Sequence, residues 1–312
     1  MNHGVPGTLA GSRPISPAAM SETRPLYWSV RRELWEYRSL HIAPLAVAGV
    51  VMLGSFVAMI GLPHDMRKLP ALDLAHQRVE LAMPYAHGTI LLMITAFIVG
   101  IFYCLDALHG ERRDRSILFW KSLPVSDLTT VLSKASIPFV ILPLIIFVVT
   151  ITLQLILFIV SSAVLVLTGA GVVTLWTRLP FVQMELGLLY GLAVVVLWHA
   201  PIYAWLLLVS GWARRATFLW AVLPPAVIAI FETLAFRTSY FGDFLKNRLW
   251  GFAASAFNFN LPDGSTIDAH FIPLTQFTPG RFLSTAGLWL GLIVAAALLA
   301  AAVRLRRYRE PI

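Results

Sequence analysis

Long runs of uncharged, mainly apolar residues alternate with short charged segments along this chain. A helix rises 1.5 Å per residue, so about 20 apolar residues cross the hydrocarbon core of a bilayer. Most of the uncharged runs reach that length, and the fifth reaches it only when Glu232 is included. The pattern predicts an all-α membrane protein with six transmembrane helices, at about residues 42–63, 84–105, 135–168, 185–210, 217–236 and 283–303.

The uncharged run 135–177 also admits a seven-span alternative, in which a hairpin divides it near its middle. The only clear helix breaker in this run is the Gly-Ala-Gly sequence at residues 169–171, and too few residues follow it for another crossing. Six spans therefore remain the better count.

The positions of Lys and Arg predict the orientation, because these residues are enriched in cytoplasmic loops. With six spans and the N-terminus inside, 16 of the 24 basic residues lie on the cytoplasmic side and 8 lie outside. The seven-span alternative weakens this split to 15 against 9, from the same total of 24. We expect a multi-pass protein of the cytoplasmic (inner) membrane with both termini in the cytoplasm.

Composition agrees with this class, since 58% of the residues are hydrophobic and 13% are charged, against about 25% charged in soluble domains. In a membrane protein the net charge of +8 reports orientation, so we do not expect a nucleic-acid partner. The single cysteine excludes an intramolecular disulfide and a thiolate metal cluster. Residues 1–23 lack the apolar core of a signal peptide and are expected to be a disordered leader, with either Met1 or Met20 as the true start.

Residues 24–41 combine aromatic and basic side chains with an approximate helical period. We expect an interfacial helix on the cytoplasmic leaflet, in which Arg side chains within the apolar arc reach lipid phosphates. An ordinary anchor preceding the first span is the alternative. The residues that would contact lipid are Trp28, Arg31, Arg32, Trp35 and Arg38.

The inner segment 106–134 separates the second and third spans and has an organised pattern. Glu111 and Arg115 are one helical turn apart, in the order that favours an ion pair. Phe119 and Trp120 then form a compact aromatic patch. We expect a short helix that protrudes from the membrane.

A stop and a new helix start follow in the same segment. Pro124 ends the short helix, and Ser126 or Asp127 is placed to cap a helix that continues into the third span. Aromatic side chains are unfavourable in water, so this unit is expected to dock on a cytoplasmic partner. A surface helix resting on lipid is the alternative.

Candidate groups for chemistry are sparse. No phosphate-binding GxxxxGK[ST] sequence is present, so we expect no bound nucleotide or other cofactor and no catalytic residue. His76 and Glu80 are two candidate metal ligands without a third, so no metal site is expected. The ionisable residues near or within the spans do not form a pair on one helix: Asp106, Glu185, His199 and Glu232.

Two further features leave alternatives open. The segment 237–282 is long and rich in aromatic residues, so it folds back onto the bundle or the outer leaflet, or forms a small lid. The small-residue spacings Gly187–Gly191 and Gly287–Gly291 allow close packing of helices.

The inner segment, above all FWKSLPVS at residues 119–126, resembles the first cytoplasmic loop of type-2 ABC exporter permeases. The interfacial helix before six spans and the long loop before the last span are also similar to that family. The resemblance covers most of residues 26–309, but only the inner segment has a specific pattern.

This resemblance implies that residues 24–41 are an elbow helix and that the inner segment is a coupling helix seated in a separate ATPase subunit. It implies a complex of two ATPase copies and two permease subunits, the second identical or related, with ATP and Mg bound only by the ATPase. The expected cargo is apolar or amphipathic. An intramembrane enzyme or a secondary transporter is the alternative. The implied coupling residues are Glu111, Arg112, Asp114, Arg115, Phe119, Trp120, Lys121, Pro124 and Ser126.

Overall fold

The computed structural model describes residues 25–114, 116, 125–258 and 276–308 of the chain. Within these ranges the protein is almost entirely helical and has no β-strand; an isolated antiparallel bridge joins Phe257 and Phe277. Six of the described helices are long and apolar enough to cross a membrane, as the sequence predicts. The chain is therefore an all-α, multi-pass membrane protein.

The candidate spans are six helical runs, and the second run contains a turn at Leu108. They are α2 (Ser39–Ala58), α4 (Leu74–Ala107) continuing into α5 (His109–Arg113), α7 (Asp127–Ser136) continuing through the π-helical η2 (Ile137–Ile141) into α8 (Leu142–Thr168), α10 (Phe181–Trp212), α11 (Thr217–Phe236) and α15 (Ala286–Tyr308). The shorter helices are α1 (Pro25–Glu36), α3 (Leu62–Lys68), η1 (Leu69–Ala71), α9 (Val172–Arg178), α12 (Tyr240–Trp250), α13 (Phe252–Ala256) and α14 (Pro279–Ser284).

Two spans begin earlier than the apolar runs indicate, because polar caps start the helices in the preceding charged segments. The Asp73 carboxylate accepts hydrogen bonds from the Ala75 and His76 amides and starts α4 ten residues before position 84. The Ser126 hydroxyl accepts from the Thr129 amide and starts α7 at Asp127, which confirms one of the two predicted caps. The third span is thus continuous with the helix that follows the inner segment.

The long run 135–177 forms one span and not a hairpin. The helix from Asp127 is unbroken to Thr168, where Gly169 (φ +63°) and Gly171 (φ +49°) adopt the left-handed conformation. Such backbone angles favour glycine, because a Cβ atom would be strained there. The predicted breaker is confirmed, and the residues after it form only the short α9.

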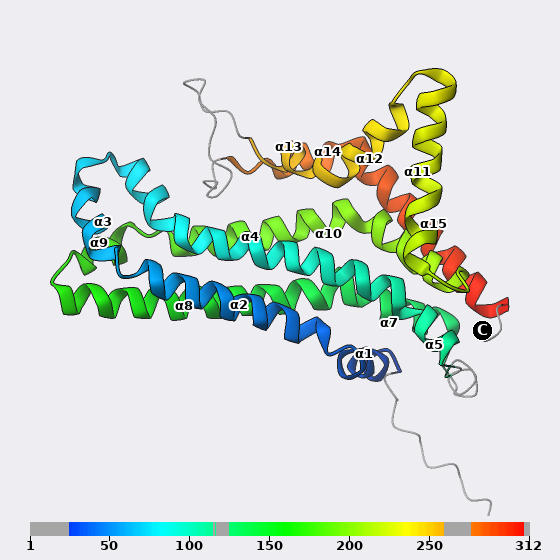
Figure 1. The fold of residues 1–312 in the computed structure, drawn as a ribbon, viewed down its shortest axis with the longest axis horizontal. Coiled ribbons are helices and arrows are strands. Elements are labelled where there is room, and N and C mark those ends of the chain that lie inside the picture. Colours follow the sequence, from blue (N-terminus) through cyan, green and yellow to red (C-terminus); the bar gives the residue numbers. More distant parts are fainter. Residues whose placement is uncertain (1–24, 115, 117–124, 259–275, 309–312) are drawn as a thin grey trace, which may run out of the picture.

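The spans form an elongated bundle (Figure 1). Helices α2, α4, α8 and α10 run side by side, with α3 and α9 at one end and α1, α5, α7 and the C-terminal end of α15 at the other. Helix α11 extends away from the bundle. In its most apolar window 56% of α10 is buried within the chain, against 11% of α2 and 6% of α11, so α10 is central and those two helices are peripheral.

The described part of the segment 237–282 packs against the flank of α10 (Figure 1). The Leu249 carbonyl lies 3.2 Å from the His199 imidazole, midway along α10, and the Tyr190 hydroxyl donates to the Ala256 carbonyl at 3.0 Å. Helices α12 and α13 therefore lie beside the middle of a span, which agrees with the predicted option of folding back onto the bundle.

The paired glycines mostly make room for side chains. A Cβ atom on Gly187 would lie 3.1 Å from the Phe277 ring, and one on Gly291 would overlap the guanidinium of Arg248. That guanidinium is buried over the Trp198 ring and donates to the Gly287 carbonyl at 3.0 Å. The glycines thus help the segment 237–282 to pack against α10 and α15.

Candidate functional site: an ion-pair network at one end of the bundle

Helix α1 lies across the end of the bundle, where Figure 1 shows it nearly end-on. Its Val30 and Leu34 side chains pack on the core around Tyr103, while Trp28 and Trp35 are 57% and 72% exposed. The exposed face is cationic as well as aromatic, because the Arg31 guanidinium lies 5.3 and 5.0 Å from the two indole ring centres. Such pairing suits a membrane interface, where both groups meet headgroups.

Glu33 occupies the inward face of α1. Its side chain is buried, and its carboxylate accepts hydrogen bonds from the Lys134 ammonium and from the Tyr103 hydroxyl, both at 2.8 Å. These contacts join α1 to α7 and to α4, which are distant in sequence.

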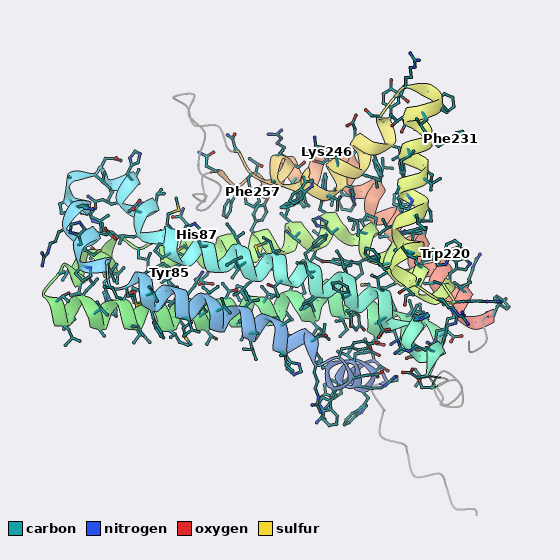
Figure 2. The ribbon with its side chains drawn as sticks, in the orientation of Figure 1. Tyr85, His87, Trp220, Phe231, Lys246 and Phe257 are labelled. Atoms are coloured by element: carbon teal, nitrogen blue, oxygen red, sulfur yellow. The ribbon has the colours of Figure 1, made fainter. Side chains whose placement is uncertain are left out.

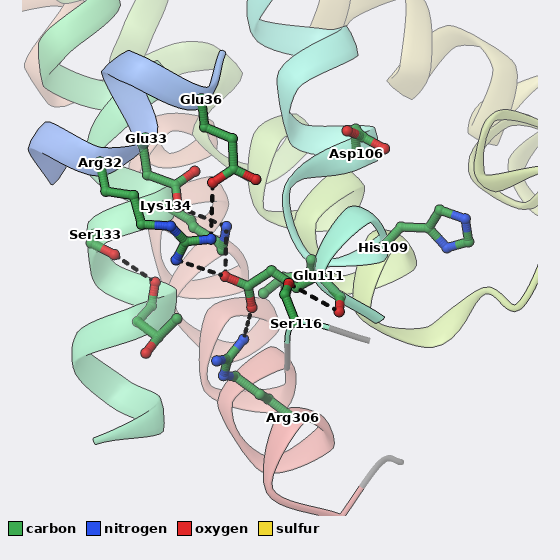
Figure 3. Close-up of polar contacts among 12 residues, drawn as sticks. Arg32, Glu33, Glu36, Asp106, His109, Glu111, Ser116, Ser133, Lys134 and Arg306 are labelled. Carbon is green, nitrogen blue, oxygen red and sulfur yellow. Dashed lines mark hydrogen bonds and ion pairs between the residues drawn. The ribbon is translucent and has the colours of Figure 1, made fainter. Parts of the chain in front are cut away.

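Glu111 of α5 is the centre of the site (Figure 3). One carboxylate oxygen lies 3.2 Å from the Lys134 ammonium and 3.4 Å from the Arg32 guanidinium, and the other accepts from Arg306 of α15. Arg306 also contacts the Asp127 carboxylate at 3.2 Å. A single carboxylate therefore connects α5 with α1, α7 and α15.

We call Glu33, Glu111, Lys134 and Arg306 the buried network, because these residues are between 1% and 6% exposed. Two negative and two positive charges compensate one another at hydrogen-bond distance. Removing one partner of a buried pair costs about 3–5 kcal/mol, because the remaining charge stays out of water. The network thus fixes the relative positions of four helices.

The inner segment is also tied to the end of α10. The Ser210 hydroxyl accepts from the amides of Leu108 and His109, both at 2.9 Å. The buried Arg112 guanidinium donates to the carbonyls of Gly211 and Ala213 at 2.8 and 3.1 Å. A cation is favourable here, since these carbonyls carry the negative end of the helix dipole.

Tyr37 links the turn after α1 to the end of α4. Its hydroxyl donates to the Asp106 carboxylate at 3.2 Å. Burial, followed by the nearby charges of Asp106 and Glu33, holds the pKa of the Tyr37 hydroxyl well above its usual value. The hydroxyl therefore stays a neutral hydrogen-bond donor.

The structure changes the interpretation of several predicted coupling residues. Glu111 and Arg112 are buried and bind other parts of the chain, and the described partners of Glu111 are distant residues. The expected pair of Glu111 with Arg115 stays a prediction, because Arg115 lies outside the described residues. Asp114 is exposed beside Arg113. Outside the described residues lie Arg115, Phe119, Trp120, Lys121 and Pro124.

The predicted interfacial residues divide between two faces of the chain. Trp28, Arg31, Trp35 and Arg38 are exposed, whereas Arg32 is half-buried and pairs with Glu36 and Glu111. Of the buried network, only Glu111 is among the residues predicted from the sequence; Glu33, Lys134 and Arg306 are not. One signal was present, since Glu33 lies on the same helical face as Val30, Leu34 and Tyr37 and is charged within an apolar stripe.

Among the other ionisable candidates, His199 and Glu232 have structural partners, whereas both carboxylate oxygens of Glu185 are buried without a hydrogen-bond partner among the described residues. His199 places both imidazole nitrogens at backbone carbonyls, of Val195 at 2.8 Å and of Leu249 at 3.2 Å. The Glu232 carboxylate accepts from the amides of Tyr240 and Phe241, both at 2.8 Å, and so caps α12. In the described part of the chain no three His, Cys, Asp or Glu side chains converge as metal ligands.

Comparison with protein-family models, with curated proteins and with solved structures gives no match to this chain.

Proposed function

We propose that this chain is the membrane-spanning permease subunit of an ABC-type exporter, which moves an apolar or amphipathic cargo such as a peptide, drug or lipid across the cytoplasmic membrane. A separate ATPase subunit, present in two copies, would bind ATP and Mg. A second permease subunit, identical or related, would complete the complex. The resemblance at residues 119–126 and the six apolar helices support this proposal.

The observation that carries the proposal is the position of Glu111 in the buried network. The residue lies at the start of the inner segment and contacts α1, α7 and α15 together. A displacement of the inner segment would therefore move three helices at once. A peripheral helix that rested on lipid would need no such connection to the bundle.

Helices α7 and α8 would carry the displacement across the membrane. Their unbroken run of 42 residues spans about 60 Å, twice the hydrocarbon core. Since Lys134 pairs with Glu111 near the start of this run, the coupling segment and the lever are joined directly. In this arrangement the exposed Trp28, Arg31 and Trp35 face of α1 would contact lipid headgroups at the cytoplasmic surface.

Affinity purification of the tagged full-length chain from its native membranes tests the proposal. We expect an ABC-type ATPase to co-purify at one copy per permease subunit, and the chain alone to show no ATP turnover. ATP hydrolysis by the isolated chain, or purification from intact membranes without any ATPase, would contradict the assignment.

The role of the aromatic patch is tested by Trp120→Ala in the same complex. Loss of an interface anchor costs 2 kcal/mol or more, so we expect about a 30-fold weaker ATPase association, or ATP turnover uncoupled from transport. Trp176→Ala is the matched control, because Trp176 is an exposed tryptophan of α9 at the opposite end of the bundle. Equal assembly and transport by both variants would remove the coupling role from this segment.

A further inference from the structure

An open groove of about 520 Å³ lies between the C-terminal parts of α10 and α15. Each helix lines it with one face, because the lining residues recur at spacings of three and four along each helix. The apolar wall and the charged end of the groove are formed by Trp205, Leu208, Leu305, Trp212, Arg304 and Tyr308. Unlike the interior of the bundle, this groove is accessible from outside the chain.

The residues at the charged end are typical of a membrane–water boundary. Trp212 is the last residue of α10, and Arg304 and Tyr308 belong to the last two turns of α15. Trp212 packs against Trp220 with ring centres 4.8 Å apart, and Figure 2 labels Trp220 at the base of α11, where this helix leaves the bundle. Trp and Tyr are enriched at this boundary, and Arg lies just beyond it. The apolar wall therefore meets acyl chains, and the charged end meets headgroups.

The charged end has an excess of positive charge. Segments 212–217 and 301–308 together contain five arginines and no acidic residue. Arg306 is buried and is compensated by Glu111 and Asp127. The other four are exposed and form no ion pair with a described residue: Arg214, Arg215, Arg304 and Arg307. The next two residues, Arg309 and Glu310, lie outside the described residues and cancel in charge. This end of the groove is therefore complementary to an anion.

The end of α10 does not oppose an anion at this position. Its last carbonyls carry the negative end of the helix dipole, which would repel a phosphate. The Arg112 guanidinium donates to the carbonyls of Gly211 and Ala213 at 2.8 and 3.1 Å, so that negative charge is already compensated. The exposed arginines remain available to a ligand from the bilayer.

We propose that this groove binds an anionic phospholipid, with an acyl chain along the wall formed by Trp205, Leu208 and Leu305 and the phosphate beside the Arg304 guanidinium. Guanidinium and phosphate groups form strong, charge-assisted hydrogen bonds. A free phosphate ion would leave the apolar wall uncovered, and a zwitterionic lipid would bring a cationic headgroup close to the arginines. Binding requires only this chain, so it does not depend on an ATPase and is tested without one.

Native mass spectrometry of the full-length chain in detergent tests the proposal, with dioleoylphosphatidylglycerol and dioleoylphosphatidylcholine as probes. We expect the first phosphatidylglycerol molecule to bind at least fivefold more tightly than the first phosphatidylcholine molecule, because each basic residue near an anionic lipid contributes about 1 kcal/mol. Glycerol 3-phosphate, which has the phosphate without acyl chains, should not displace it. Equal affinities for the two lipids, or displacement by glycerol 3-phosphate, would overturn the proposal.

A charge variant tests whether the preference is local to the groove. Arg304→Gln should lower the affinity for phosphatidylglycerol about fivefold and leave the affinity for phosphatidylcholine nearly unchanged. Arg178→Gln is the matched control, because Arg178 is exposed at the end of α9, at the opposite end of the bundle. Equal losses in the two variants would show a general effect of net charge and would contradict a site at Arg304.

A second variant fills the groove. Ala301 lines it, so Ala301→Leu should lower the affinity for both lipids at least tenfold. Ala296→Leu, at an exposed position on a different face of α15, should not. A second copy of this chain is the competing occupant. In that case Ala301→Leu would dissociate a dimer that carries no phosphatidylglycerol, and this result, like unchanged lipid binding by Ala301→Leu, would overturn the proposal.

Discussion

At the scale of single residues, the buried network makes Glu111 the most connected charge of the described structure. Lys134 bridges Glu33 and Glu111, and Arg306 bridges Glu111 and Asp127. Each ammonium or guanidinium group therefore serves two acids. The cost of burying these charges is offset only while all of them are present.

We expect Glu111→Gln to lower the free energy of unfolding by about 3–5 kcal/mol. The amide retains the shape of the side chain but removes the negative charge that pairs with Lys134 and Arg306, so their positive charges stay buried with one fewer acid. Chemical unfolding of the purified protein in detergent measures the change. Asp65→Asn is the control, since Asp65 and Lys68 form an exposed pair and an exposed pair contributes at most about 1 kcal/mol.

A double variant tests whether the loss comes from the charge. Glu111→Gln combined with Arg306→Gln removes one charge of each sign and retains the Lys134–Glu33 pair. Contacting residues are coupled, so the double variant should be more stable than the sum of the single changes predicts by about 1–3 kcal/mol. Simple additivity would show that the network does not act as a unit.

The sequence identifies one member of this network, Glu111, and its partner Arg32, but not the association of the four residues. Glu111 and Arg32 stand out because they lie in charged segments beside apolar runs. Glu33, Lys134 and Arg306 are separated by about 100 residues or more, so their contacts depend on how α1, α7 and α15 meet in space. Periodicity describes one helix at a time and cannot supply that information.

At the scale of elements, helix boundaries follow local chemistry that the sequence displays. The Ser126 cap and the Gly169 break agree with prediction because each depends on a few neighbouring residues. The apolar run does not show the early start of α4, because it begins only after the last charge of the preceding segment, whereas the Asp73 cap starts the helix ahead of those charges.

The same substitution at two glycines should have opposite effects. Gly169→Ala places a Cβ atom at φ +63° and should destabilise the protein by about 1–2 kcal/mol. Gly54→Ala, within α2 and with open space around it, should stabilise the protein by up to about 1 kcal/mol through helix propensity. Thermal unfolding in detergent measures both, and shifts of equal sign would contradict the left-handed cap.

At the scale of the whole molecule, the segments that connect or flank the four side-by-side spans α2, α4, α8 and α10 lie at the two ends of the bundle. Helices α1, α5 and α7 and the end of α15 gather at one end, together with the buried network, and α3 and α9 occupy the other (Figure 1). The sequence predicts this grouping from six crossings and the basic residues. It could not predict that α12 and α13 return to the middle of α10, because that placement depends on tertiary contacts such as His199 with Leu249.

This arrangement makes a topological prediction that does not depend on cargo or partner. The single native cysteine, Cys104, is buried, so introduced cysteines can be labelled against a low background. Arg215→Cys and Arg307→Cys, at exposed positions near one end of the bundle, should react with a membrane-impermeant maleimide only from the cytoplasmic side. Arg178→Cys, exposed at the end of α9, should react only from the outer side.

Labelling in intact cells and in inverted vesicles distinguishes the two sides. The expected pattern follows from α10 crossing the membrane once between positions 178 and 215, and from α11 and α15 together returning the chain to its starting side. A cysteine at 307 that labels opposite to one at 215 would mean that α11 or α15 does not span the bilayer. Positions 178 and 215 on one side would contradict the crossing of α10, and with it the six-span topology on which the coupling role of residues 106–134 depends.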